Sequence, residues 1–248
     1  MTILIANWKM HGDAGLAENL LSSIAVLDHQ GVDIGLMVPF PYLSMAQNKL
    51  KHTKISWGAQ AMSSELKGAY TGDVSVSMLQ DFGCKQVIVG HSERRKHWFE
   101  SDLSIAQQAA VAILHDLVPI ICVGESKASR DSGKYMEDIE SQVKIIIEQL
   151  KLSQAVGKFI IAYEPVWAIG SGESASLGQV VEVHQAIRRC LLHLALEFSN
   201  NCIIIYGGSV NSSNLSELLS ASEIEGFLVG GASLNTESFI DMVNVCKV

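Results

Sequence analysis

Short runs of apolar residues, rich in Ile and Val, recur from one end of the chain to the other. Each run is about five to seven residues long and is apolar throughout, which is typical of parallel strands that are covered on both faces. The pattern therefore predicts a series of buried strands. In chain order the eight runs are ILIAN (3–7), IGLMVP (34–39), ISWGAQ (55–60), QVIVG (86–90), VPIICVG (118–124), FIIAYE (159–164), CIIIYGG (202–208) and GFLVGG (226–231).

Longer segments between most of these runs have the spacing of amphipathic helices. Apolar side chains that step by three or four residues form one stripe along residues 179–198, which predicts a single helix there. A weaker stripe marks a helix between the first two runs. The stripe residues are Val180, Val183, Ile187, Leu191, Leu194 and Phe198 in the first case, and Leu16, Leu20, Ser23, Ile24 and Leu27 in the second.

Strands that alternate with about eight helices over this length predict an α/β protein with a closed (β/α)8 barrel. The alternative is a doubly wound open sheet, which usually binds a dinucleotide and has a glycine fingerprint after an early strand. Neither GxGxxG nor GxxxxGK[ST] occurs in the sequence, which favours the closed barrel. No Pro/Ser/Gly-rich linker or block of charge interrupts residues 1–248, so we expect a single domain.

Composition and charge disfavour several classes of partner and location. The chain has 248 residues, 48% hydrophobic and 18% charged, and its net charge of −8 disfavours nucleic acid and anionic membranes as partners. The apolar start has no basic region before it and is soon interrupted by Lys9, so we expect neither a signal peptide nor a membrane span. Five widely separated cysteines indicate reduced thiols in a cytoplasmic protein, with neither a zinc site nor a disulfide framework.

Polar side chains follow several predicted strands at their C-terminal ends, where a barrel of this kind has its active site. Asn7 and Lys9 follow the first run. Two residues apart on a strand, they should point to the same face, while Trp8 points to the other. A lysine directed into the barrel mouth would attract an anionic substrate and stabilise negative charge on oxygen.

His91 and Glu164 follow or end the fourth and sixth runs. Ser92 is a candidate N-cap, and a histidine at a helix start is biased towards the neutral imidazole because the positive end of the helix dipole disfavours added charge. Glu164 is a lone carboxylate at the end of a nearly apolar stretch. We therefore expect it to be buried and to have a raised pKa, as a general base does.

Glycine-rich turns follow the last three predicted strands. In (β/α)8 barrels the loops after strands seven and eight often hold a phosphate with backbone N–H groups. An acidic protein can bind a small anion in this way without an arginine. The turns are Gly170-Ser171-Gly172, Gly207-Gly208-Ser209 and Gly230-Gly231.

The sequence resembles the triosephosphate isomerase family along its whole length. The resemblance implies a homodimeric enzyme of glycolysis and gluconeogenesis that interconverts dihydroxyacetone phosphate and D-glyceraldehyde 3-phosphate without a metal or cofactor. VGHSERR and AYEPVWAIG are its most specific parts. The motifs are NWKM (7–10), GAYTGDVS (68–75), VGHSERR (89–95), CVGE (122–125), AYEPVWAIGSG (162–172), YGGSV (206–210) and GFLVGGASL (226–234).

The resemblance implies a role for each polar side chain at the barrel mouth. Glu164 would be the base that moves a proton between adjacent carbons through an enediolate, and neutral His91 would polarise the carbonyl. Lys9 and Asn7 would stabilise the enediolate, and Glu93 would orient Lys9. The positions implied for substrate and phosphate binding are Asn7, Lys9, Gly170, Ser209, Gly230 and Gly231.

The resemblance also implies a mobile lid and a subunit interface. The lid would run from Pro165 to about Ala175, and the small, apolar loop 68–75 would enter a second, identical subunit. The chain departs from the common pattern at His11, Val76, Ser171 and Glu173, but at none of the catalytic positions. Lid residues are Pro165, Val166, Trp167, Ala168, Ile169, Ser171 and Gly172, and interface residues are Met10, Tyr70 and Thr71.

Two other functions are compatible with a phosphate-binding barrel. A lyase or synthase that uses Schiff-base chemistry would need a lysine at the end of a later strand, and no run ends in one. A non-catalytic binding protein that keeps the fold would be expected to have lost a catalytic residue, and none is lost. The sequence therefore favours the isomerase.

Overall fold

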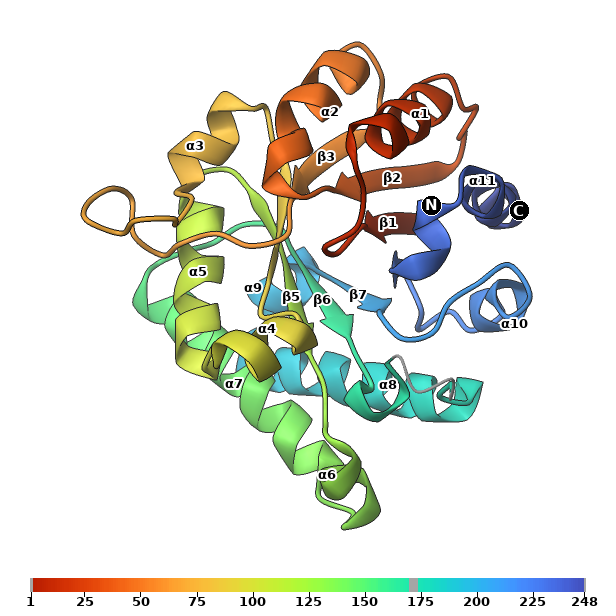
Figure 1. The fold of residues 1–248 in the computed structure, drawn as a ribbon. Coiled ribbons are helices and arrows are strands. Elements are labelled where there is room, and N and C mark those ends of the chain that lie inside the picture. The colour runs from red at the N-terminus through yellow and green to blue at the C-terminus, as the bar shows by residue number, and fades with distance from the viewer. Residues whose placement is uncertain (1, 170–173, 248) are drawn as a thin grey trace.

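The structure is a computed structural model that describes residues 2–169 and 174–247. Eight parallel strands form a closed barrel in chain order, in which β1 pairs with both β2 and β8. Figure 1 shows the strands at the centre with the helices around them. The strands are β1 (Thr2–Asn7), β2 (Val32–Met37), β3 (Ser56–Ala59), β4 (Gln86–Val89), β5 (Val118–Val123), β6 (Phe159–Tyr163), β7 (Cys202–Tyr206) and β8 (Gly226–Val229).

The helices cover the outside of the barrel, and neighbours in this outer layer pack against one another, as α5 does with α7 and α7 with α8. The α-helices are α1 (Ala14–Ala25), α2 (Leu43–Leu50), α3 (Val76–Asp81), α4 (Ser92–Trp98), α5 (Asp102–Leu114), α6 (Lys127–Asp131), α7 (Tyr135–Leu152), α8 (Leu177–Leu194), α9 (Leu196–Asn201), α10 (Leu215–Leu219) and α11 (Thr236–Cys246). Short 3-10 helices are η1 (Phe40–Tyr42), η2 (Val166–Ala168) and η3 (Gly231–Leu234).

Two apolar layers explain why the strands are apolar throughout. One set of side chains fills the barrel interior, including Ile5, Ile88 and Ile160. The residues that alternate with them pack outward against the helices in a larger cluster, as Leu4 and Phe159 do. Because both faces of every strand are buried, the sequence pattern of continuous apolar runs correctly predicted the closed (β/α)8 barrel.

Element ends differ from the sequence pattern in two respects. Most strands end a residue or two before the apolar run does, because the last positions already belong to the turns that form the barrel mouth. The single helix predicted over 179–198 is two helices, since Ala195 adopts an extended conformation between α8 and α9. The Leu194 carbonyl, which a continuous helix would use internally, instead accepts a hydrogen bond of 2.8 Å from Lys151 Nζ.

Candidate active site

Asn7 and Lys9 both reach the barrel mouth, but not for the reason that the sequence suggested. β1 ends at Asn7, and Lys9 lies beyond it with a φ of 52°, a left-handed conformation that residues other than glycine rarely adopt. The Lys9 backbone N–H donates to Asn7 Oδ1 (3.0 Å), which holds this turn. The prediction that both residues lie on the strand was therefore wrong, although Trp8 is buried among the helix-facing residues as expected.

Lys9 is directed by two neighbours at the barrel mouth. Its Nζ donates to Glu93 Oε1 at 2.6 Å. A Cβ added at Gly230 would lie 3.2 Å from Lys9 Cε, so glycine leaves room for the lysine stem. These contacts bring the ammonium group to the end of β8, where the glycine-rich turn 230–231 begins.

His91 itself caps the helix that follows β4. Its Nδ1 accepts a hydrogen bond from the Glu93 backbone N–H (3.2 Å), whereas Ser92, the predicted N-cap, is the first residue of α4. An Nδ1 that accepts from an amide carries no proton, so this network fits a neutral imidazole with its proton on Nε2. The helix start therefore orients the ring and selects its tautomer.

Glu164 follows β6 directly and is 2% exposed. Its Oε1 lies 3.0 Å from His91 Nε2, and its Oε2 accepts a hydrogen bond of 2.8 Å from the Ser92 backbone N–H. Gly124, which follows β5, lets the Glu164 backbone lie close to it, because an added Cβ would approach the Glu164 backbone carbonyl oxygen to 1.8 Å. The carboxylate predicted as the base thus lies against the histidine predicted to polarise the carbonyl.

The pKa values of this pair depend on their mutual contact. Burial, the largest influence, raises the pKa of Glu164, but His91 and the Ser92 amide together hold it below its ordinary value. The raised pKa expected from the sequence is therefore wrong for this conformation. Burial likewise lowers the pKa of His91, and the Glu164 carboxylate raises it above its usual value. Because the contact between them contributes to both shifts, separating the two side chains would raise the pKa of Glu164 and lower that of His91.

A cavity of about 390 Å³ joins these side chains to the glycine-rich turns. Asn7, Lys9, His91 and Glu164 line one part of it. The remainder is lined by Ala168, Ile169, Gly207, Gly208, Ser209, Val210, Asn211, Leu228, Gly230, Gly231 and Ala232. The predicted base (Glu164), the predicted electrophile (His91) and the Lys9 ammonium group therefore line the same cavity as the glycine-rich turns after β7 and β8. The predicted residues Gly170, Ser171 and Gly172 lie outside the described residues.

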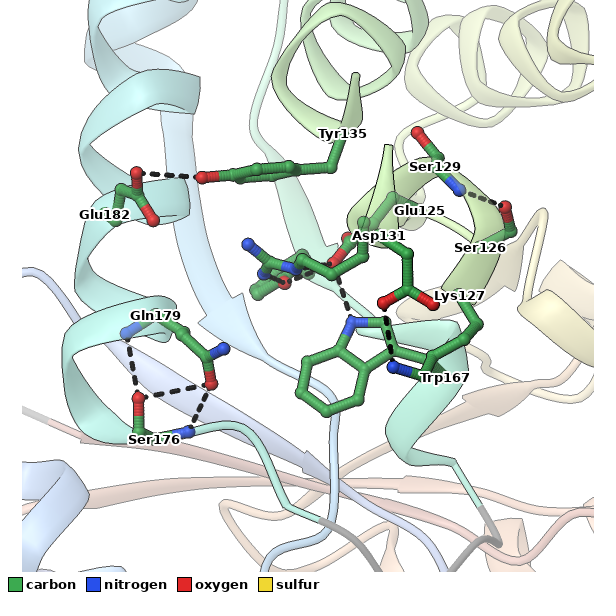
Figure 2. Close-up of polar contacts among 12 residues, drawn as sticks. Glu125, Ser126, Lys127, Ser129, Asp131, Tyr135, Trp167, Ser176, Gln179 and Glu182 are labelled. Atoms are coloured by element: carbon green, nitrogen blue, oxygen red, sulfur yellow. Dashed lines mark hydrogen bonds and ion pairs between the residues drawn. The ribbon is translucent and has the colours of Figure 1, made fainter. Parts of the chain in front are cut away.

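The segment after Glu164 is anchored by a partner that the sequence did not identify. Trp167, in η2, donates its indole N–H to Glu125 Oε1 (2.8 Å), as Figure 2 shows. Glu125 follows β5 and is almost fully buried. Glu125 belongs to the motif CVGE, but nothing in the sequence indicated that it contacts Trp167, 42 residues further along the chain.

Of the three predicted interface residues, Met10 lines a second, more apolar cavity beside the first. This cavity, about 270 Å³, is lined by Asn7, Lys9 and His91 and by apolar side chains that include Met10 and Trp98. Met10 is 94% exposed and Trp98 62%. Tyr70 and Thr71 are exposed in the segment between β3 and α3, which projects from the barrel in Figure 1.

Two features of the described residues bear on other classes of protein. In that part of the chain, no group of three or more His, Cys, Asp or Glu side chains is placed to hold a metal ion. None of its helices is both long enough and apolar enough to cross a bilayer.

Comparison with known proteins assigns the family. A sequence model of triosephosphate isomerase matches residues 2–246. Similar proteins named triosephosphate isomerase include that of Thiobacillus denitrificans, 44% identical over 96% of this chain and 95% of its own. That of Bordetella pertussis is 44% identical over 96% and 94%, and that of Cupriavidus taiwanensis 41% over 98% of both chains. The chain thus belongs to the triosephosphate isomerase family.

Proposed function

We propose that Glu164 and His91 are the proton-transfer pair of this isomerase. As a family member, the protein is an aldose–ketose isomerase that interconverts dihydroxyacetone phosphate and D-glyceraldehyde 3-phosphate. The observation that carries the proposed roles is the 3.0 Å contact between His91 Nε2 and Glu164 Oε1, in a cavity whose other end is lined by glycine-rich turns. The family assignment also favours the isomerase over the lyase and binding-protein alternatives.

The proposed chemistry moves one proton between adjacent carbons. The Glu164 carboxylate takes the proton from the carbon next to the carbonyl, and the electrons move onto the carbonyl oxygen to give an enediolate. His91 Nε2–H donates a hydrogen bond to that oxygen and passes protons between the two oxygens. The protonated Glu164 then returns its proton to the neighbouring carbon, which completes the isomerisation.

Glu164 must exchange partners to do this. Both of its oxygens accept hydrogen bonds in the described conformation, from Ser92 and His91. Moving towards a substrate carbon would remove these donors while burial remained, so its pKa would rise. His91 would lose the carboxylate that raises its own pKa. Glu164 would then be a stronger base and His91 would be held as the neutral imidazole, as their proposed roles require.

Lys9 and Asn7 are proposed to stabilise the negative charge that develops on the substrate oxygens. Glu93 holds the Lys9 ammonium at 2.6 Å and is therefore proposed to orient it. The ammonium also lies near Gly230, so it can contact the phosphate end of the substrate. A fixed cation inside a cavity stabilises an oxyanion more strongly than one in water does.

The phosphate is proposed to bind the backbone N–H groups at the glycine-rich turns. Ser209 and the turn 230–231 line the cavity, and η3 begins at Gly231. Gly170, together with Ser171 and Gly172, completes the proposed lid with Pro165, Val166, Trp167, Ala168 and Ile169. Closing the lid would exclude water from the enediolate, which would otherwise eliminate phosphate.

A homodimer is proposed from the exposed apolar surface beside this site. Met10 and Trp98 are exposed and line the cavity that shares Asn7 and Lys9 with the active site, and Tyr70 is exposed on the projecting loop. A projecting loop that contains Tyr70 and Thr71 is suited to insertion into such a cavity on a second copy. Each active site would then be completed by its neighbour.

We also propose a domain organisation and a cellular location for the protein. We infer that residues 1–248 form one domain, because β1 and β8 pair to close a single sheet. We also infer a cytoplasmic protein, because the cysteines of the described chain are all free thiols.

The proposed roles are tested by Glu164→Gln. The amide keeps the shape of the side chain but cannot accept a proton, so glyceraldehyde 3-phosphate formation in a coupled assay should be abolished while the circular dichroism spectrum is unchanged. Glu148→Gln is the matched control, because Glu148 is an exposed carboxylate on α7. Retention of more than a tenth of wild-type activity by Glu164→Gln would disprove the assignment of the base.

A further inference from the structure

The turn that carries Lys9 is closed by bonds within the loop between β1 and α1. Lys9 has a φ of 52°, and its N–H donates to Asn7 Oδ1 at 3.0 Å. The His11 N–H donates to the Trp8 carbonyl at 3.2 Å. A residue with a Cβ rarely adopts this left-handed conformation, so the turn persists only where the surrounding structure holds it. Bonds within one short turn do not by themselves fix where it lies against the barrel.

Tyr42 reaches this turn from the neighbouring loop. β1 pairs with β2, so the loops that follow these two strands lie next to each other. The Tyr42 hydroxyl donates to the Gly12 carbonyl at 3.0 Å. Within residues 2–169 and 174–247, it is the one hydrogen bond that joins the backbone of residues 9–12 to another loop. The hydroxyl thus ties the Lys9 turn to the segment after β2.

The ring of Tyr42 packs against the same loop a second time, at the residue before Lys9. Its centre lies 6.5 Å from that of a Trp8 ring, and the two planes are tilted by 53°. Trp8 is itself fully buried among the side chains that face the helices. Tyr42 therefore holds the loop on both sides of Lys9, through its hydroxyl at Gly12 and through its ring at Trp8.

Tyr42 is carried by a stiff segment. It ends η1, which follows Pro39 and contains Pro41, and the rings of both prolines fix their φ angles. The Tyr42 N–H donates to the Pro39 carbonyl at 2.9 Å. Leu43, the next residue, is 2% exposed and begins α2. A side chain on such a segment has little freedom to follow a moving loop, so it can act as a fixed support.

We propose that Tyr42 is a positioning residue that acts through Lys9. By holding Gly12 and Trp8, it keeps the left-handed turn in place, so that the ammonium group is directed at Glu93 and into the cavity. The role rests on the proposed function of Lys9, which is to stabilise negative charge on the substrate oxygens and to contact the phosphate. Tyr42 lines neither cavity as the described residues form them, so it acts only through the loop.

Tyr42→Phe removes the hydroxyl and keeps the ring against Trp8. It should lower kcat and raise KM, each by roughly threefold, because a displaced ammonium group stabilises the oxyanion and binds the phosphate less well. The inhibition constant of inorganic phosphate should rise by the same factor as KM. Tyr42→Leu, which also removes the ring, should give larger changes in all three constants. Wild-type constants in Tyr42→Phe would overturn the proposal.

The same constants separate positioning from general damage to the fold. A variant that merely unfolded more easily would contain fewer active molecules, so its kcat would fall while KM and the phosphate inhibition constant stayed unchanged. Thr53→Val is the matched control, because the Thr53 hydroxyl donates to the Leu50 carbonyl at 2.8 Å at the other end of α2. It should leave all three constants unchanged. A fall in kcat alone in Tyr42→Phe, or equal changes in Thr53→Val, would overturn the proposal.

A double-mutant cycle tests whether the effect passes through Lys9. In a Lys9→Ala background no ammonium group is left to position, so adding Tyr42→Phe should change kcat/KM by less than about twofold. An undiminished loss in that background would reject the role of Tyr42 alone. Wild-type activity in Lys9→Ala itself would instead reject the proposed function of Lys9, so the two failures are distinguishable.

An effect through assembly is measured separately, because the turn also carries Met10, which is 94% exposed. Tyr42→Phe should sediment as wild type does at the assay concentration, and its specific activity should not depend on protein concentration. Activity that recovers as the protein concentration rises would show that Tyr42 acts through subunit contact, and would overturn the proposal.

Discussion

A buried histidine that packs against β6 should make the protein acid-sensitive. His184, in α8, is 1% exposed, and its Nδ1 lies 2.9 Å from the Glu223 carbonyl oxygen, to which it donates. Its ring packs edge-on against Tyr163, the last residue of β6. Burial lowers the pKa of His184 from 6.5 to about 4, with a smaller contribution from Arg188.

The sign and size of the effect follow from linkage. Above pH 6.5, His184 is neutral in both the folded and unfolded states and contributes no pH dependence. Below pH 6.5, the unfolded chain binds a proton that the native state excludes until the pH reaches about 4. At about 1.36 kcal/mol per pKa unit, the free energy of unfolding should fall by about 2 kcal/mol by pH 5 and by about 3 kcal/mol by pH 4.

His184→Asn removes the imidazole but keeps a side-chain N–H that can donate to Glu223. Wild type should therefore be more stable than the variant at pH 7.5, and this advantage should shrink by about 2 kcal/mol at pH 5 in urea unfolding at one protein concentration. His52→Asn, at an exposed histidine, controls for loss of an imidazole. An NMR titration midpoint for His184 within half a unit of about 6.5 would refute the reasoning.

Four further predictions concern the active site and assembly. Glu164→Asp, which retracts the carboxylate by about 1 Å, should lower kcat on the order of a hundredfold, and an unchanged kcat in the coupled assay would contradict the geometry. Prolonged dialysis against EDTA should leave turnover intact; activity lost and then restored by a divalent ion would show a metal requirement. Phosphate and sulfate should inhibit competitively and slow proteolysis near Trp167, so cleavage unaffected by saturating phosphate would count against lid closure. Thr71→Arg should split the dimer by burying an unpaired charge and should lower activity; sedimentation of a fully active wild-type monomer would exclude this assembly.

The sequence was sufficient for the barrel because its signal is repeated in every strand. Runs that are apolar on both faces have few other architectures available at this length, so a misplaced strand end did not change the prediction. The break at Ala195 was not predictable from the stripe, since Phe198 is buried whether or not the helix is continuous. The Leu194 carbonyl at the end of α8 accepts a hydrogen bond from Lys151 on a different helix, and periodicity within one helix contains no information about such a contact.

Local geometry at the site was harder to predict than the identity of its residues. Lys9 and His91 were chosen because they follow strands, yet one adopts a left-handed turn and the other caps its own helix. Both features depend on a side chain or amide two residues away, Asn7 for Lys9 and Glu93 for His91. Residue spacing along an ideal strand does not predict such turns. The position of both residues after predicted strands nevertheless predicted the correct end of the barrel for their side chains.

The electrostatic error at Glu164 has a different origin, in the way the barrel brings distant strands together. β4 and β6 do not pair with each other, because β5 lies between them. In a closed barrel of eight strands, however, alternate strands direct their side chains into the same layer. The residues that follow β4 and β6 therefore meet, and Glu164 is stabilised by His91 and Ser92, which lie on a distant part of the chain. An apolar flanking sequence correctly predicts burial, but the direction of a pKa shift is decided by the partners that the fold supplies.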